Sequence, residues 1–129
     1  MRGRRTFGYT LAGMLMAGVA LLAAKAADTP PPRPAYVIGE VTVHDPEGYK
    51  AYVAAVTPVV ARFGGTYLAR GGRTVAVEGD APAGRVVILA FPSVEAAEAF
   101  EGSADGKAAA ALRQRASRGR FFIVEGVAR

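Results

Sequence analysis

The chain has 129 residues, of which 51% are hydrophobic and 21% charged, a composition that excludes an acidic disordered tail and favours a single globular domain. It has no cysteine and one histidine, which excludes a disulfide framework, a cysteine nucleophile and a multi-histidine metal site within one chain. The net charge of +5 is concentrated in residues 1–26, which hold four basic residues and no acidic one. The remaining twelve basic and eleven acidic residues nearly balance, so we predict no nucleic-acid partner.

Residues 1–26 have the organisation of an export signal peptide. Three arginines precede an apolar run, and Ala24-Lys25-Ala26 places small residues at both positions of a cleavage site. Arg4-Arg5-Thr6-Phe7 is similar to the core of a twin-arginine motif, so both the twin-arginine and the general secretory routes stay open. We expect cleavage after Ala26 and a periplasmic or extracellular location. The alternative is an uncleaved segment of about 17 apolar residues that anchors the chain, the only membrane association expected.

Residues 27–35 form a proline-rich linker, which is extended because its prolines exclude a helix. The domain proper is predicted for residues 36–127 and begins with a strand over 36–43 that has a two-residue period. One face of this strand is wholly apolar, with Val37, Gly39, Val41 and Val43. The other face carries Tyr36, Ile38, Glu40 and Thr42, followed by His44.

A helix is predicted from Asp45 to the glycine pair at 64–65. Asp45 is suited to cap it, and Pro46 is suited to its first turn. Pro58 should kink the helix or split off its last turn. One buried stripe recurs at helical spacing and consists of Tyr49, Tyr52, Val53, Val56, Val60 and Phe63.

Three extended segments follow. A short strand over 66–70 reaches Gly71-Gly72, which indicates a turn or a bulge. The alternation over 73–78 predicts a further strand, either a separate hairpin arm or a continuation of the same strand. Residues 85–91 are apolar throughout, which is typical of a central strand covered on both faces.

The last part of the chain predicts a divided helix and a final strand. Ser93 caps a segment whose inward residues are Ala96, Ala97 and Phe100, and Gly102-Ser103 interrupts it. An alanine-rich helix then runs from Asp105 to about Ser117, with Leu112 as its main apolar anchor. Residues 120–126 form the last strand.

The strand–helix–strand arrangement occurs twice, which predicts a ferredoxin-like α+β sandwich: an antiparallel sheet of four or five strands with two helices on one face. Two helices cover only one face of such a sheet. Because the central strands are apolar on both sides, we expect the uncovered face to meet the same face of a second subunit in a homodimer.

Several segments together resemble one family, the domain-of-unknown-function 1330 family, over residues 35–127. They include Asp45-Pro46-Glu47-Gly48-Tyr49, then Leu68-Ala69-Arg70-Gly71-Gly72, then Phe91-Pro92-Ser93, and last Val124-Glu125-Gly126. The resemblance implies a subunit that pairs through its sheet into a dimeric α+β barrel, and it implies no particular reaction. One departure is Ser103-Ala104-Asp105-Gly106, which lacks the aromatic residue that the family commonly has there.

The candidate ligand-binding residues are polar side chains on this sheet, namely Arg70, Glu40, Arg85, Glu125 and Tyr36. An arginine and a carboxylate in a largely apolar cavity suit a small carboxylate or phenol. His44 is the one catalytic candidate, as a base, and its alternative is a solvated loop residue. Arg70 has an alternative as well, an ion pair with Glu78 or Glu40.

Other polar groups have structural interpretations. We take Tyr49 and Tyr52 as core residues, and the run of Arg113, Arg115, Arg118 and Arg120 as a solvated face. We predict an exported protein that binds a small, partly apolar ligand in its barrel, without a metal or cofactor. Cofactor-independent oxygenase or isomerase chemistry fits by analogy with related barrels. The alternative is a structural or stress-related interaction module whose interior is packed by Tyr36, Ile38, Leu89 and Phe121.

Overall fold

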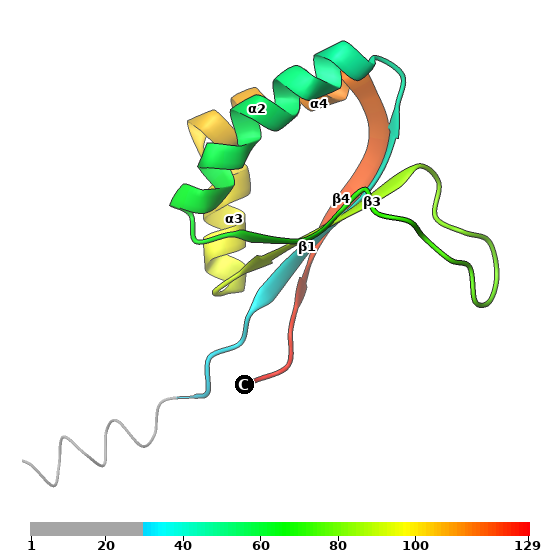
Figure 1. Ribbon diagram of the computed structural model, residues 1–129. Coiled ribbons are helices and arrows are strands. Elements are labelled where there is room, and N and C mark those ends of the chain that lie inside the picture. The colour runs from blue at the N-terminus through cyan, green and yellow to red at the C-terminus, as the bar shows by residue number, and fades with distance from the viewer. Residues whose placement is uncertain (1–29) are drawn as a thin grey trace, which may run out of the picture. The chain divides into compact units, whose positions relative to one another are not determined.

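The structure is a computed structural model that describes residues 30–129. The predicted export signal and the first three residues of the predicted linker, 27–29, lie outside these residues. The elements in chain order are β1 (Ala35–Val43), α2 (Pro46–Arg62), β2 (Thr66–Arg70), β3 (Arg85–Phe91), α3 (Val94–Gly102), α4 (Ala104–Ala116) and β4 (Ser117–Glu125). The four strands form one antiparallel sheet in the order β2-β3-β1-β4, and all three helices lie on one of its faces (Figure 1). The predicted α+β sandwich is confirmed.

The core lies between the helices and alternate residues of the central strands. Val37 and Val41 of β1 are almost wholly buried, as are Leu89 and Phe91 of β3. The rings of Phe91 and Phe100 stack with their centroids 5.3 Å apart, which joins β3 to α3. These contacts follow from the two-residue period of the strands, which places every second side chain under the helices.

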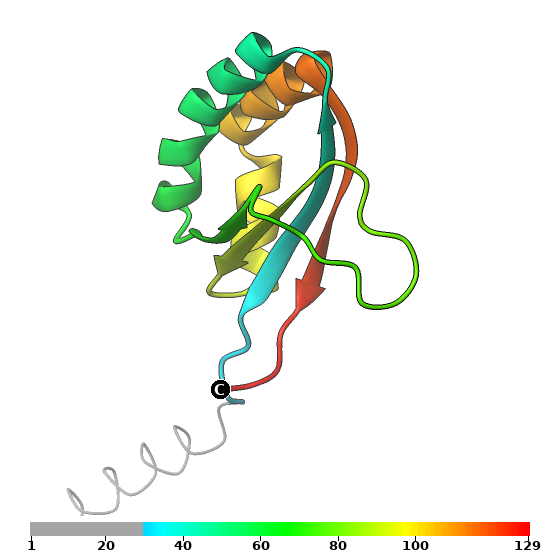
Figure 2. The same cartoon turned by 45° about the vertical axis from the view of Figure 1, so that its right-hand side comes forward.

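The other face of the sheet is open in the subunit. Ile38 and Glu40 of β1 lie on it, and in the paired strand β4 Phe122 and Val124 are each 43% exposed. The prediction that 85–91 is central is confirmed. Its expected cover on both faces is not present within the described subunit, because all three helices pack on the same side (Figure 2).

Helix α2 begins as its sequence predicts, with the Asp45 carboxylate accepting a hydrogen bond from the Gly48 N–H at 3.1 Å. It then runs as one helix through Pro58 to Arg62, so of the two effects predicted for Pro58, a kink or a split, the splitting of the last turn was wrong. Proline removes the bond to the carbonyl of the residue four positions earlier, Ala54. Both residues are exposed, so water can satisfy that carbonyl.

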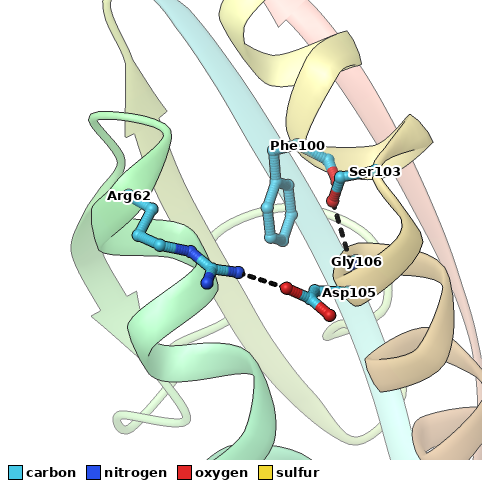
Figure 3. A network of polar contacts seen from close by, with 5 residues as sticks. All are labelled: Arg62, Phe100, Ser103, Asp105 and Gly106. Atoms are coloured by element: carbon cyan, nitrogen blue, oxygen red, sulfur yellow. Dashed lines mark hydrogen bonds and ion pairs between the residues drawn. The ribbon is translucent and has the colours of Figure 1, made fainter.

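Ser103 separates α3 from α4 (Figure 3). Its hydroxyl accepts a hydrogen bond from the Gly106 N–H at 2.9 Å and donates one to the Phe100 carbonyl at 2.8 Å. An ion pair of 2.6 Å between Arg62 and Asp105 joins α2 to α4 (Figure 3). The predicted interruption of the second helix is therefore confirmed, with a serine cap as its cause.

The anchor of α4 differs from the prediction. Leu112 is only half-buried, whereas Ala109 and Ala116 are 2% and 1% exposed. Alanine has no side chain beyond Cβ, so these positions allow a close approach between α4 and the rest of the core. Leu112 instead lines a surface depression with Ala55 and Pro58 of α2.

The predicted strand over 73–78 was wrong. Residues 71–84 form an irregular connection between β2 and β3, in which Val75 is 68% and Val77 97% exposed. A strand needs a neighbour to pair with, and β3 is already paired with β2 on this side. Of the two alternatives predicted for Gly71-Gly72, a turn or a bulge, only the bulge lies elsewhere. The register of β2 shifts at Leu68, whereas Gly71 has a φ of +69° and begins the connection.

The two ends of the described domain run side by side (Figure 2). The carbonyl of Pro34 accepts a hydrogen bond from the Gly126 N–H at 2.7 Å, and that of Pro32 accepts one from the Arg129 N–H at 3.4 Å. The last residues of the predicted linker are thus part of the domain. Among residues 30–129, none of the helices has both the length and the apolar character that crossing a bilayer requires.

Candidate functional site

Arg70 and Arg85 lie together, at the ends of two neighbouring strands and beneath α2. The bulge at Leu68 makes this possible. Tyr67 is paired with Leu89 and Arg70 with Val87, and both partners face the core. In a regular strand, residues three positions apart point to opposite faces. The extra residue turns Arg70 back to the helix side, next to Tyr67.

These two arginines line a small pocket between α2 and the sheet. The pocket has a volume of about 10 Å³, room for one water-sized group. Its walls combine tyrosines, arginines and valines, namely Tyr49, Tyr52, Val53, Val56, Tyr67, Arg70, Arg85 and Val87. We call these eight residues the arginine–tyrosine pocket. Its polar groups come from α2, β2 and β3.

Each guanidinium of this region lies against an aromatic ring. The Arg85 carbon Cζ is 5.1 Å from the centroid of Tyr49, and that of Arg70 is 4.2 Å from the centroid of Tyr67. A third guanidinium comes from α4: the Cζ of Arg113 is 5.6 Å from the ring centroid of Tyr52. The pocket is therefore lined by cationic groups stacked on the faces of tyrosine rings.

The two arginines that line the pocket, Arg70 and Arg85, form no ion pair within residues 30–129. The ion pairs there involve Arg33, Lys50, Arg62 and Arg120, and none involves Arg70, Arg85 or Arg113. Arg70 donates to a neutral group, the Thr57 hydroxyl, at 3.0 Å. The Nε of Arg85 is buried and has no hydrogen-bond partner. A buried donor of this kind is costly to leave unmatched, so it indicates a site for an acceptor.

The tyrosines keep their protons at neutral pH. Burial raises the pKa of Tyr49 above its ordinary value, and the nearby Arg85 partly offsets this. Burial also raises the pKa of Tyr52, against the opposing effect of Arg113. Both phenols are thus available as neutral hydrogen-bond donors beside the arginines.

The other predicted site residues lie elsewhere. Glu40 is on the open face, where both of its carboxylate oxygens accept bonds from Arg120 at 3.2 Å. Tyr36 lies on the same open face, with Val124 as its partner on β4. The structure thus gives Arg70 neither of its alternative ion pairs, because Glu40 is bound to Arg120 and Arg70 bonds to Thr57.

The remaining two candidates are at the ends of strands. Glu125 lies 3.7 Å from Arg33 at the far end of β4, in an exposed ion pair. His44 is exposed, and its backbone N–H donates to the Ala116 carbonyl at 3.0 Å. The structure therefore brings two of the six candidates together, Arg70 and Arg85. Within residues 30–129, no three acidic or histidine side chains gather as a possible metal site.

Sequence reasoning missed the tyrosines and Arg113. The spacing of Tyr49 and Tyr52 indicates only that they share the buried face of α2, which is correct for both. Their hydroxyls near the arginines were not foreseen, because that proximity depends on how α2 lies over β3. Arg113 was assigned to a solvated face, yet it lies 4.0 Å from the Phe121 ring centroid.

Residues 34–127 match a protein family described as "Domain of unknown function (DUF1330)". The chain belongs to this family. The match spans nearly all of the described domain, so the predicted resemblance is confirmed. No curated protein matches the DUF1330 chain.

Solved structures share its fold. A protein of unknown function from Rhodopseudomonas palustris, RPA0582, is 22% identical with a TM-score of 0.59, covering 85% of this chain and 94% of its own. A methylated form of RPA0582 gives a TM-score of 0.60 at 22% identity, covering 84% and 90% of the two chains. SnoaB, a cofactor-independent oxygenase from Streptomyces nogalater, is 20% identical with a TM-score of 0.50, covering 76% and 94%. At these identities the likeness concerns the fold alone.

Proposed function

We propose that this DUF1330 protein binds a small organic anion, a carboxylate or phenolate with an apolar body, in the arginine–tyrosine pocket. The observation that carries the proposal is the unpartnered Nε of Arg85, buried beside a second arginine without an acidic counterpart. A carboxylate or phenolate oxygen accepts charge-assisted hydrogen bonds from such donors. The apolar body would lie against the tyrosine rings and the valines.

The free volume limits how such a ligand is bound. The space of about 10 Å³ admits at most one oxygen atom of the anionic group and no ring. Arg70 is exposed, and Tyr67 is half-buried beside it on β2. We propose that Tyr67 moves aside on binding and that the exposed Arg70 turns toward the anion, while the half-buried Arg85 and the buried Tyr49 stay in place and orient it.

The same groups would support chemistry without a cofactor. A guanidinium close to an enolate or phenolate stabilises the negative charge that forms when the substrate loses a proton to solvent water. Cofactor-independent oxygenases and isomerases both need such stabilisation, and SnoaB, with a similar fold, is described as a cofactor-independent oxygenase. We therefore propose this class of reaction for the DUF1330 protein, with Arg85 as the group that stabilises the anion.

Matched probes and variants test the binding proposal. Benzoate carries the anion, and benzamide has the same ring and shape without the charge. Benzoate should bind the wild type measurably by isothermal titration calorimetry, and benzamide about tenfold or more weakly. Arg85→Met keeps the apolar stem and removes the donors, and it should abolish the preference for benzoate, as should Arg70→Ala. Arg115→Ala, exposed on α4, is the control.

Several outcomes would contradict the proposal. One is equal affinity of the wild type for benzoate and benzamide, and another is unchanged benzoate affinity in Arg85→Met. Native mass spectrometry of the protein purified from its own host offers a test without a chosen probe. Extra mass that is lost on denaturation should accompany the wild type and be absent from Arg85→Met.

We propose further that the protein is a homodimer joined through the open face of the sheet. Ile38, Phe122 and Val124 place apolar surface on that face, and burying it would remove it from water. Sedimentation velocity should give a dimer that Phe122→Asp converts to monomer. A monomeric wild type at about 100 µM, a level at which most specific dimers form, would contradict this.

A non-enzymatic interaction module is the second candidate function. It is favoured by the small volume of the pocket and by the exposed apolar groups of the open face. The packing set predicted for it is divided between the two faces, with Leu89 in the core and Ile38 on the open side. Ligand-free dimers from the native host, together with no response to benzoate, would favour this candidate.

Export is also proposed, from residues 1–26, which lie outside the described residues. Their three arginines, apolar run and Ala24-Lys25-Ala26 sequence support it. Amino-terminal sequencing of the protein from a periplasmic fraction should begin at Ala27. Recovery of the full-length chain in the membrane fraction would instead support the anchor.

A further inference from the structure

Residues 73–78 have the sequence of a strand and no partner in their own subunit. Apolar residues alternate with others in Arg73-Thr74-Val75-Ala76-Val77-Glu78. Among residues 30–129 no backbone hydrogen bond joins this segment to another. Val77 is 97% exposed, the highest exposure among the large apolar residues that lie on the surface. Both views show the connection extending beyond the sheet, away from the helices (Figures 1 and 2).

The outer edge of β4 offers a place for a strand. This strand is the last in the sheet and pairs with β1 on one side only, over nine residues. An edge strand of this length presents a row of unpaired backbone N–H and carbonyl groups. The opposite edge, β2, is shorter, at five residues. The subunit thus holds both a strand-like segment without a partner and a long edge without one.

The two match in pattern and in charge. Phe122 and Val124 project from β4 onto the open face. A strand added beside β4 would place Val75 and Val77 next to them in one apolar row. The segment ends at Glu78, with Asp80 two residues later, and β4 begins with Arg118 and Arg120. An antiparallel register places Val75 beside Val124 and Val77 beside Phe122. It also brings Glu78 and Asp80 toward Arg120 and Arg118, so the opposite charges favour this register.

The position of residues 71–84 decides which chain can supply a strand to the β4 edge. In the sheet, β1 lies between β3 and β4, so residues 71–84 are attached on the far side of β1 from the β4 edge. The segment projects from the open side, where the second subunit of the homodimer would lie. We propose that residues 73–78 of one subunit add as a fifth strand to the β4 edge of the other, reciprocally. This inference rests on the proposed homodimer.

Such an exchange would also couple dimerisation to the positions of the two arginines in the arginine–tyrosine pocket. Residues 71–84 join Arg70 directly to Arg85, so their position affects both ends of the connection. In a free subunit these ends are held by the Gly71 N–H, which donates to the Val86 carbonyl at 2.8 Å. A partner strand would hold the middle of the connection as well and restrict both arginines.

Proline substitutions test the exchange. Proline has no N–H and is not accepted within a paired strand, and successive N–H groups of a strand point to opposite sides. One of Ala76→Pro and Val77→Pro must therefore remove a hydrogen bond to the partner. That variant should raise the dimer Kd about tenfold or more, measured by sedimentation equilibrium. Ala81→Pro, in the same connection but outside the segment, should change it by less than about twofold.

Because the segment is unpaired in the single subunit, the prolines should leave the subunit folded, as far-ultraviolet circular dichroism would verify. Hydrogen exchange gives a measurement without substitution. Amides of 73–78 and of 117–125 should become protected together as the protein concentration rises through the dimer Kd.

The remaining outcomes show which of the two proposals, the sheet-face dimer or the strand exchange, is wrong. A wild-type dimer whose Kd neither proline changes by more than about twofold would overturn the strand exchange and leave the sheet-face dimer intact. A monomeric wild type would overturn both. Protection of 73–78 in monomeric protein would place its partner within its own chain and would also overturn the exchange.

Discussion

The helix-covered face and the open face of the sheet take alternate residues from the same strands. On β1, Val37 and Val41 are buried beneath the helices, while Ile38 and Glu40 lie on the open side. The covered face holds the hydrophobic core and the arginine–tyrosine pocket, and the open face holds an exposed ion pair among apolar groups. Apolar residues of the covered face are removed from water within the subunit, whereas those of the open face are not. An apolar side chain should therefore stabilise the subunit more on the covered face than on the open face.

Replacing one aromatic residue on each face by alanine should give the largest difference in the free energy of unfolding. Phe91→Ala removes a core ring stacked on Phe100 and should lower the free energy of unfolding by about 3–5 kcal/mol. Phe122→Ala, on the open face, should cost about 1 kcal/mol or less in dilute protein. Its cost should grow with protein concentration if the dimer buries this face. Urea titrations at two protein concentrations measure the free energy of unfolding of both variants. Equal losses in the two variants that do not change with protein concentration would contradict this prediction.

The neighbouring glycines at 71 and 72 test the backbone at the edge of the pocket. Gly71 has a φ of +69°, and a Cβ there would lie 2.6 Å from the Arg85 guanidinium. Gly71→Ala should therefore cost about 1–2 kcal/mol and displace Arg85. Gly72 has open space around it, so Gly72→Ala should be neutral or slightly stabilising. Similar urea midpoints for the two variants would contradict this account.

The helix layer depends on its caps. Ser103 caps α4, and Ser103→Ala should lower the free energy of unfolding by about 1 kcal/mol. Ser103→Asp retains a cap acceptor and should recover most of the loss, although it cannot donate to the Phe100 carbonyl. Thermal unfolding followed by circular dichroism measures both variants. A loss that Asp does not reduce would assign the effect to the bond with Phe100.

The smallest expected effect concerns Glu101, beside Phe121 and Ile123 at the margin of the covered face. Burial raises the pKa of Glu101 above its ordinary value of 4.5, against the opposing effect of Arg113. Its contribution to stability is therefore fully present below pH 4.5 and is lost as the pH rises through the raised pKa. Glu101→Gln should thus be more stable than wild type at pH 7, and this advantage should disappear toward pH 4.

The control for that prediction is Glu98→Gln, at an exposed position of the same helix. Its stability relative to wild type should change less between pH 7 and pH 4. Urea titrations at both values of pH give the comparison. A Glu101→Gln variant that is less stable than wild type at pH 7 would show that the interaction with Arg113 outweighs burial.

Much of the fold was predictable because its signals are local. Asp45 and Ser93 mark the starts of two helices through hydrogen bonds to N–H groups three residues away. The period of two over 36–43 identified β1 and its buried face correctly. The predicted strand over 73–78 failed because strand-like alternation does not supply a pairing partner, and none of the described residues of its subunit pairs with it.

The candidate site was predictable only in part. Arg70 and Arg85 were identified as polar groups near strand ends, which is a local property. Glu40 was grouped with them, but its side chain lies on the open face with Arg120. Tyr67 and Arg70 share a face through the bulge at Leu68, for which the sequence has no distinctive signal.

The sequence by itself determined the order of the helices and of the four paired strands, the helix caps, the alternation that assigns each strand two faces, and the family. These depend on interactions within a few residues or on periodic hydrophobicity. Only the tertiary structure decided which polar groups meet. Arg85, Tyr49 and Arg113 come from a strand and two helices, and their proximity results from the packing of α2 and α4 over the sheet. Contacts between distant segments depend on packing and register, which no short stretch of sequence contains.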